Sequence, residues 1–203
     1  MAQKLADYRK TIMNKRWTKF LTESKLRVFD FDDTLVKTDA SIKMTDPAGK
    51  SHSMTPAEFA DHEVDEENQY DFSEFEQANL INPREIEKVT KILRNVVGAG
   101  GDREVVILTA RTPQAQGSIE EYLEDIGIDY SGIDIVLVGN PDPAAKANWI
   151  ENKIVDGATD ILFLDDSGRN INAVLNLKNK YPEVKIDARV VDYAEEIAEG
   201  VIR

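Results

Sequence analysis

The sequence predicts a doubly wound α/β fold, in which helices pack on both faces of a parallel sheet. Three observations predict it. Short apolar runs alternate with longer segments of helical periodicity, which is typical of a parallel sheet with right-handed crossovers. The apolar runs are continuous, as expected of strands buried on both faces. One stretch after the first run breaks the alternation and predicts a small hairpin-containing insertion.

The elements of this fold can be placed in order along the chain. Pro83 and Pro113 stand where the first turn of a helix tolerates proline, and the glycines of residues 98–101 end the first of these helices. The expected strands are residues 27–31, 104–109, 133–138, 161–164 and 184–191. The expected helices between them are residues 83–97, 113–125, 144–155 and 170–180.

Residues 1–25 are expected to form an N-terminal amphipathic helix before an α/β core that spans residues 26–203. Apolar side chains recur there at three- and four-residue steps, among them Leu5, Tyr8 and Trp17. We expect this stripe to pack on the chain's own core. The alternatives are a helix that binds a partner and a basic helix that binds at a membrane surface.

The insertion lies at about residues 38–80. Segments 41–45 and 50–54 flank the turn sequence Asp-Pro-Ala-Gly at 46–49, which predicts a β-hairpin. Residues 58–76 carry nine acidic side chains and no Lys or Arg. We expect this acidic segment to be a solvated face rather than a metal site.

Composition excludes several classes of function. The 203 residues contain no cysteine, so disulfides, thiolate metal sites and cysteine nucleophiles are excluded. No apolar run approaches the length of a membrane span, and the N-terminus lacks a signal-peptide core, so we expect a cytoplasmic protein with no membrane partner.

The net charge of −13 is unevenly distributed. Residues 1–27 carry eight basic and two acidic side chains, so the rest of the chain carries −19. An acidic body repels a nucleic-acid backbone, which makes a long duplex an unfavourable partner. The basic N-terminal segment leaves binding to a nucleic-acid end open.

Chemically active side chains gather where the expected strands end. Asp30, Asp32 and Asp33 follow the first strand, while Asp165 and Asp166 follow the fourth. Ligands of open α/β sheets bind at the carboxyl ends of strands. Carboxylates this close together require a cation, and Mg²⁺ suits a site that shares its coordination with phosphate.

Two further side chains can hold a phosphoryl group at the same edge. Thr109 ends the second strand, where its hydroxyl and nearby backbone N–H groups can bind a phosphate oxygen. Lys146, at the start of the helix before the fourth strand, can supply a cation to the same group.

Taken in order, these motifs resemble those of the haloacid dehalogenase-like (HAD) superfamily. The four motifs are Asp-Phe-Asp-Asp-Thr at 30–34, Ile-Leu-Thr at 107–109, Lys146, and Phe-Leu-Asp-Asp-Ser-Gly-Arg-Asn at 163–170. The resemblance covers roughly residues 27–175. It implies a Rossmann-like core with a cap inserted between the first two motifs, at about 38–80. The chain also resembles small phage-encoded HAD-like phosphatases and nucleic-acid-end phosphatases.

The resemblance implies a role for each motif residue. Asp30 would be the nucleophile that forms an aspartyl-phosphate. Asp32 would protonate the leaving oxygen and later deprotonate water, and its presence favours phosphoryl transfer because dehalogenating relatives lack an acid there. Thr109 and Lys146 would bind the transferring group.

The resemblance also implies a Mg²⁺ site. The ligands would be the Asp30 carboxylate, the Asp32 backbone carbonyl and Asp166, with Asp165 as the second candidate. Alignment with the family's Asp-x-x-x-Asp pattern favours Asp166. Asn170 then stands where many relatives have a second acid.

The roles of two basic motif positions each have an alternative. Lys153 competes with Lys146 for the lysine motif, and we favour Lys146 because it opens its helix and so lies nearer the strand ends. Arg111 is assigned to phosphate binding as a clamp on a second part of the substrate. The alternative is that Arg111 pairs with a surface acid.

The function implied is a Mg²⁺-dependent phosphomonoesterase that acts on a small phosphorylated substrate such as a nucleotide. One alternative is a polynucleotide 3′-end phosphatase, which the net charge disfavours. Another is a non-catalytic HAD-like domain kept for binding or regulation. The same aspartyl-phosphate would also serve a phosphotransferase.

Overall fold

The computed structural model describes residues 24–55, 58–59, 62–76 and 80–191. The helix expected at residues 1–25 therefore lies almost entirely outside the described residues. None of the helices in these described segments has the length and apolar character that a membrane span requires.

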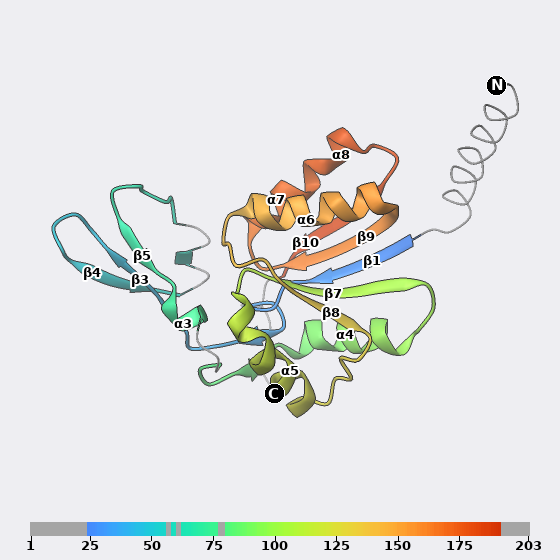
Figure 1. Cartoon of the computed structure of the whole chain (residues 1–203), viewed down its shortest axis with the longest axis horizontal. Helices are drawn as coiled ribbons and strands as arrows, with labels where there is room; N and C mark the ends of the chain where they lie inside the picture. The colour runs from blue at the N-terminus through green and yellow to red at the C-terminus, as the bar shows by residue number, and fades with distance from the viewer. Residues whose placement is uncertain (1–23, 56–57, 60–61, 77–79, 192–203) are drawn as a thin grey trace, which may run out of the picture.

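A five-stranded parallel sheet forms the centre of the molecule and confirms the predicted fold class (Figure 1). Its order is β10 (Lys185–Val190), β9 (Ala158–Asp165), β1 (Ser24–Phe29), β7 (Arg103–Thr109) and β8 (Ile133–Leu137). The chain runs outward from β1 to β8, then returns to β9 on the other side of β1. The topological switch point, where ligands bind in such sheets, thus lies between β1 and β9.

Helices cover both faces of the sheet. In the view of Figure 1, α4 (Glu87–Gly98) and α5 (Gln116–Asp125) lie below it, while α6 (Pro143–Asp156) and α7 (Gly168–Leu175) lie above. Two short helices extend these elements: the 3₁₀ helix η1 (Pro113–Ala115) leads into α5, and α8 (Leu177–Lys180) follows α7. The helix expected at 170–180 is thus two helices, and it begins at Gly168 because Ser167 caps it.

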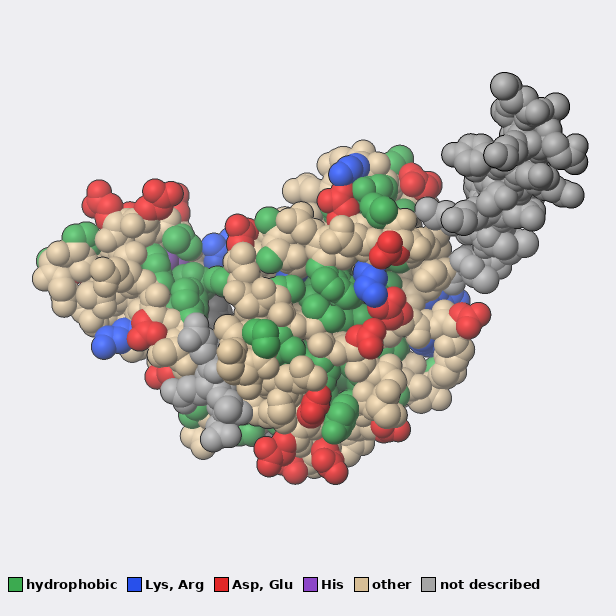
Figure 2. All heavy atoms as spheres, in the orientation of Figure 1, with side chains coloured by type: hydrophobic (Ala, Val, Ile, Leu, Met, Phe, Trp, Pro, Cys, Tyr) green, Lys and Arg blue, Asp and Glu red, His purple; other side chains and the backbone are tan. Residues whose placement is uncertain are grey.

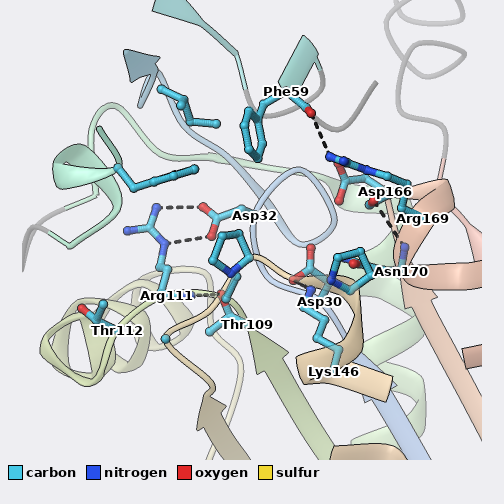
Figure 3. Close-up of a pocket in the computed structure, with 17 residues that line it drawn as sticks. Asp30, Asp32, Phe59, Thr109, Arg111, Thr112, Lys146, Asp166, Arg169 and Asn170 are labelled. Atoms are coloured by element: carbon cyan, nitrogen blue, oxygen red, sulfur yellow. Dashed lines mark hydrogen bonds and ion pairs between the residues drawn. The ribbon is translucent and has the colours of Figure 1, made fainter. Parts of the chain in front are cut away.

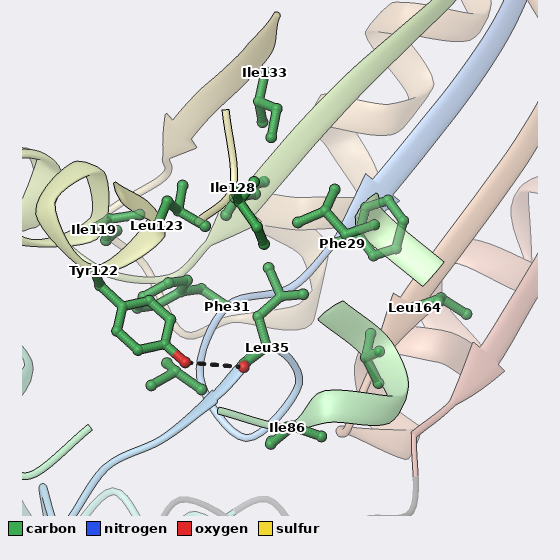
Figure 4. Close-up of a cluster of buried hydrophobic side chains, with 14 of the residues drawn as sticks. Phe29, Phe31, Leu35, Ile86, Ile119, Tyr122, Leu123, Ile128, Ile133 and Leu164 are labelled. Atoms are coloured by element: carbon green, nitrogen blue, oxygen red, sulfur yellow. Dashed lines mark hydrogen bonds between the residues drawn. The ribbon is translucent and has the colours of Figure 1, made fainter. Parts of the chain in front are cut away.

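The strands bury alternate side chains on opposite faces. In β7, Val105 and Ile107 belong to the core between the sheet and helices α4 and α5. Val106 and Leu108 belong to the core between the sheet and helices α6 and α7. The first of these cores is shown in Figure 4, where Tyr122 of α5 donates a hydrogen bond to the Leu35 carbonyl at 3.5 Å. Each such buried aliphatic side chain contributes about 1.5–3 kcal/mol, which explains the continuous apolar runs.

The insertion contains a three-stranded antiparallel sheet that stands apart from the core in Figure 1. The predicted hairpin is formed by β3 (Ile42–Thr45) and β4 (Ser51–Met54). A third strand that the sequence pattern did not predict, β5 (Gln69–Asp71), pairs with β3 and leads into α3 (Ser73–Glu76). We refer to these elements, with Phe59 and His62, as the cap.

The helix predicted at 83–97 begins later than expected, at Glu87. Arg84 and Glu85 instead form β6 (Arg84–Glu85), which pairs antiparallel with β2 (Val36–Lys37). Pro83 therefore precedes an extended segment and does not open a helix. This β-ladder ties the two ends of the insertion together at the edge of the core.

Candidate active site

The predicted site residues gather at the carboxyl edge of the sheet, where β1, β7 and β9 end and α6 and α7 begin (Figure 3). A pocket of about 340 Å³ lies there, between the core and the cap. Asp30, Asp32, Thr109 and Lys146 all line it, although they come from three distant parts of the sequence.

Lys146 joins two of the acids at the base of this pocket. Its Nζ lies 2.5 Å from Asp30 Oδ1 and 2.8 Å from Asp165 Oδ2, and all three side chains are buried. Burial opposes the charge on Lys146, but the carboxylates of Asp165 and Asp30 raise its pKa above the usual range. The ammonium therefore stays charged and offsets the negative charge of two buried carboxyl groups.

The start of α6 explains why Lys146 reaches the site and Lys153 does not. Asp142 caps the helix by accepting a hydrogen bond from the Ala144 amide at 2.8 Å, and Pro143 occupies its first position. Lys146 lies in the following turn, beside the strand ends. Lys153 lies two turns further on, where it pairs with Glu104 outside this pocket.

The two adjacent acids after β9 have different environments. Asp165 is fully buried, and its oxygens accept hydrogen bonds from Lys146, the Ser167 amide and the Asn170 side chain. Asp166 is partly exposed and lines the pocket. Asp165 therefore orients Lys146 and Asn170, which leaves Asp166 as the acid that faces the pocket.

The carboxylate oxygens of Asp30, Asp165 and Asp166 lie within 4.8 Å of one another. Burial raises the pKa of Asp30 to about 7, and the neighbouring carboxylates of Asp165 and Asp32 add to this against the opposing effect of Lys146. Burial also raises the pKa of Asp166, and the carboxylates of Asp30, Asp165 and Asp33 add to this shift. A hard divalent cation with oxygen ligands fits this uncompensated negative charge.

The turn after β1 links both acid-bearing strands. Thr34 Oγ1 donates a hydrogen bond to Asp30 Oδ2 at 3.3 Å. Thr34 Oγ1 also accepts a hydrogen bond from the Asp166 amide at 3.1 Å. At Asp33 the turn adopts the left-handed backbone conformation, with a φ of 52°. Asp is among the few non-glycine residues that tolerate this conformation.

Arg111 contacts the other acid of the first motif. Its Nε and Nη2 donate to the two oxygens of Asp32 at 2.9 and 2.7 Å, a bidentate ion pair in which the guanidinium is buried. Neither assignment made from the sequence foresaw this pairing. Thr109 stabilises the same turn, because its Oγ1 accepts a hydrogen bond from the Arg111 amide at 3.2 Å.

Two solved structures share this overall fold. The HAD domain of effector protein Lem4 from Legionella pneumophila, in an inactive-mutant form, is 15% identical to this chain; the match covers 88% of this chain and 93% of that domain with a TM-score of 0.52. A second structure of the Lem4 HAD domain is also 15% identical and covers 87% and 93%, with a TM-score of 0.50.

The chain has a HAD-like fold. No sequence-family profile matches it, and no curated protein matches it significantly. The specific resemblance to phage-encoded HAD-like phosphatases stays a prediction, as do the chemical roles of the site residues.

The cap contributes pocket residues that the sequence analysis missed. Ile42, Phe59 and Phe72 line the pocket opposite the acids, and Arg169 from α7 joins them. The only sequence signal was the presence of Phe59, Tyr70 and Phe72 in an otherwise acidic stretch. Within that stretch, the acidic side chains of residues 63–67 are exposed, as expected of a solvated face.

Proposed function

We propose that this HAD-like protein is a Mg²⁺-dependent phosphomonoesterase that acts through an aspartyl-phosphate on a small phosphorylated substrate. The observation that supports this most directly is the position of Asp30. Its carboxylate lies at the base of a pocket at the switch point of the sheet, in contact with Lys146 and close to Asp166.

In the first step, an Asp30 oxygen attacks phosphorus while the bond from phosphorus to the leaving oxygen breaks. Lys146 compensates the negative charge of the transferring group from the side of Asp30. The Thr109 hydroxyl lies at the same strand edge, where it can donate to a phosphoryl oxygen. Asp32 protonates the leaving oxygen as the bond breaks, so the products of this step are an aspartyl-phosphate on Asp30, the released alcohol and the Asp32 carboxylate.

In the second step, water attacks the phosphorus of the aspartyl-phosphate and regenerates the Asp30 carboxylate. Asp32 accepts the proton of that water. The ion pair with Arg111 fixes the Asp32 carboxylate in the pocket, because both of its oxygens accept from one rigid guanidinium. Arg111 thus positions the base, and contact of Arg111 with phosphate would require part of this ion pair to open.

Asp30, Asp166 and the backbone carbonyl of Asp32 would hold the Mg²⁺ ion. Asp165 is the weaker candidate because Lys146, Ser167 and Asn170 already occupy its oxygens. Once bound, the cation offsets the charge of the phosphoryl group and of the clustered carboxylates.

Surface charge favours a small substrate over a polynucleotide. Acidic side chains are spread over the cap and the core on the face shown in Figure 2, where basic side chains are sparse. Such a surface repels a phosphate backbone. The basic N-terminal residues that support nucleic-acid binding lie mostly outside the described part of the chain.

The proposal is tested by hydrolysis of p-nitrophenyl phosphate, nucleotides and 3′-phosphorylated oligonucleotides, with Mg²⁺ or with EDTA. We expect turnover that requires Mg²⁺ and that falls at least about 10³-fold in Asp30→Asn. Asp134→Asn, which removes an exposed carboxylate from β8, is the matched control. Folded protein that binds Mg²⁺ but hydrolyses no substrate would favour the binding-domain alternative.

A further inference from the structure

The central sheet ends in two edge strands that differ in their protection. On β10, every second residue from Lys185 to Arg189 is charged, and charged side chains on an edge discourage pairing with a further strand. The sequence of β8 is Ile-Asp-Ile-Val-Leu, with Asp134 as its one charged residue and with no proline. Its register with β7 contains no bulge, and no other described strand pairs with it. The edge at β8 is therefore open to another strand.

The backbone groups on the outer side of β8 follow from one hydrogen bond. The Val138 amide donates to the Thr109 carbonyl of β7 at 2.9 Å. The amides and carbonyls of successive residues in a strand point to opposite sides, so those of Val136 also face β7. Those of Ile135 and Leu137 point away from the sheet, and no described residue outside the sheet hydrogen-bonds to their backbone. Their donors and acceptors form the unpaired row that an added strand would use.

A groove of about 480 Å³ follows this edge. It is lined by residues 133–136 of β8, by Trp149 and Lys153 of α6, and by Glu120 of α5. Asp134 is aligned with Val106, which belongs to the core next to α6, so its side chain lies on the α6 side. Ile135 is aligned with Ile107 and lies on the α5 side. A strand bound in the groove would place alternate side chains on these two sides.

The charges along the groove are negative. Lys153 is neutralised by its ion pair with Glu104 and lies 5.0 Å from the centroid of the Trp149 ring. Asp134 is exposed, and Glu120 accepts a hydrogen bond from the neutral Gln116 side chain at 2.9 Å. Neither of these acids has an ion-pair partner in the described part of the chain. A complementary strand therefore carries basic side chains.

A second copy of the chain fits this edge poorly. Pairing of β8 with β8 of another copy would gather the acids of both copies, Asp134 and Glu120, along one seam. It would also join two chains that each carry a net charge of −13. Like charges opposite one another destabilise strand pairs, whereas opposite charges stabilise them. The edge therefore favours a partner of basic character.

We propose that the outer edge of β8 binds an extended segment of a protein partner, with basic side chains beside Asp134 and apolar side chains against Ile135. The segment adds a strand to the sheet: its backbone exchanges hydrogen bonds with Ile135 and Leu137, and the flanking side chains give specificity. The groove shares no lining residue with the pocket at Asp30. The interaction is therefore independent of the phosphomonoesterase function and would anchor the protein without occupying that pocket.

The first test measures binding of a fluorescein-labelled peptide, Thr-Lys-Val-Lys-Val-Lys-Thr, to the full chain by fluorescence anisotropy. The peptide alternates basic and apolar side chains, as the edge requires. A peptide with Glu in place of each Lys should bind at least about tenfold more weakly, and the difference should shrink as salt is added. Equal affinities of the two peptides, or no binding of the Lys peptide at millimolar concentration, would overturn the proposal.

Strand addition has a readout that simple charge attraction lacks. In hydrogen-exchange NMR, saturating Lys peptide should slow exchange of the Ile135 and Leu137 amides. It should affect the Val136 amide less, because that group already faces β7. The same peptide N-methylated throughout keeps its charges but has no backbone donors, and it should bind more weakly. Equal binding of the methylated peptide, or no protection at Ile135 and Leu137, would contradict strand addition.

The variant Asp134→Lys reverses the charge on the protein side of the groove. We expect the Kd of the Lys peptide to rise by about twofold to tenfold. Glu183→Lys makes the same change at an exposed position just before β10 and is the matched control, which should change the Kd less. Equal effects of the two variants would show that net charge alone governs binding and would overturn the proposal.

Sedimentation equilibrium without peptide tests the other occupant of the edge. We expect no self-association through β8. A dimer in which the Ile135 and Leu137 amides are protected from exchange would assign this edge to a second copy of the chain and would overturn the proposal.

Discussion

At the scale of single residues, Lys146 links the stability of the fold to its chemistry. The residue is 4% exposed and lies between the carboxylates of Asp30 and Asp165, so three buried charges depend on one another. A buried ion pair adds little stability over an apolar replacement, but removal of one partner leaves the other charges uncompensated. The proposed nucleophile is therefore held in a position that a single substitution disrupts.

The variant Lys146→Met should lower the free energy of unfolding by about 3–5 kcal/mol at pH 8 without metal. The loss should shrink as pH falls, because the unpaired acids acquire a raised pKa in the folded state and folding then favours their protonated forms. Urea denaturation at pH 8 and pH 5 in EDTA measures both values.

Lys153→Met is the control for this prediction. Lys153 belongs to the same helix as Lys146, and its partly exposed ion pair with Glu104 of β7 should cost less than about 1 kcal/mol to remove at either pH. A deficit in Lys146→Met that matches the control, or that is the same at both pH values, would contradict the prediction.

Asp33 is a second buried acid, and its position is set by the turn after β1. Its φ of 52° is required by the turn, its side chain is 3% exposed, and its Oδ2 has no hydrogen-bond partner among the described residues. Burial raises the pKa of Asp33 to about 6, with Lys37 opposing and Asp32 adding to the shift. Because the folded-state pKa is raised, its contribution to stability is full below the ordinary value of 3.8 and is lost as pH rises through 6.

Asp33→Asn should therefore stabilise the protein at pH 8 by up to about 3 kcal/mol relative to wild type, with the gain vanishing near pH 4. Asn keeps the shape and tolerates the left-handed conformation. Urea denaturation at several pH values measures the difference, and Asp134→Asn, at an exposed position, should show none of it. A gain that does not change with pH would refute a buried, titrating carboxyl.

At the scale of elements, helix starts position the site. Residues Asp142 and Ser167 accept hydrogen bonds from the first-turn amides of α6 and α7, and both helices begin at the pocket. Sequence alone placed the first residue of each helix to within two residues, because capping side chains and periodicity are local signals. The β-ladder of β2 with β6 was missed because its two halves lie almost fifty residues apart and are two residues long.

Replacement of the α6 cap should affect stability through this hydrogen bond. Asp142→Ala is expected to lower the free energy of unfolding by about 1 kcal/mol, because the Ala144 amide loses its acceptor. Asp142→Ser supplies another oxygen and should recover most of the loss. Equal stabilities of the two variants in urea denaturation would show that the cap contributes nothing.

At the scale of the whole molecule, the site is a junction between distant segments. Asp30, Thr109, Lys146 and Asp166 approach one another only when three strands (β1, β7 and β9) and helix α6 are in place. A ligand that bridges β1 and β9 should therefore stabilise the entire fold, since it binds the folded chain and has no assembled site in the unfolded one.

Mg²⁺ should raise the melting temperature of the wild type for this reason. At a concentration one hundred times the Kd, the expected stabilisation is about 2.7 kcal/mol, or roughly 5–10 °C for a chain of this size. Thermal unfolding with MgCl₂, compared with NaCl at equal ionic strength, measures it. Asp166→Asn should reduce the shift strongly and Asp134→Asn should retain it; an equal shift in both would place the ion elsewhere.

The sequence by itself determined the sheet, the two helical layers, the hairpin and the order of acids at the strand ends. Each depends on local periodicity or on residues adjacent in the chain. Only the tertiary structure decided that Asp165 binds Lys146 while Asp166 faces the pocket, that Arg111 pairs with Asp32, and that Phe59 and Phe72 form the opposite wall. Neighbouring residues at a strand end point in different directions, and their partners lie on separate elements, so the direction of each side chain is set by the packing of the sheet, helices and cap.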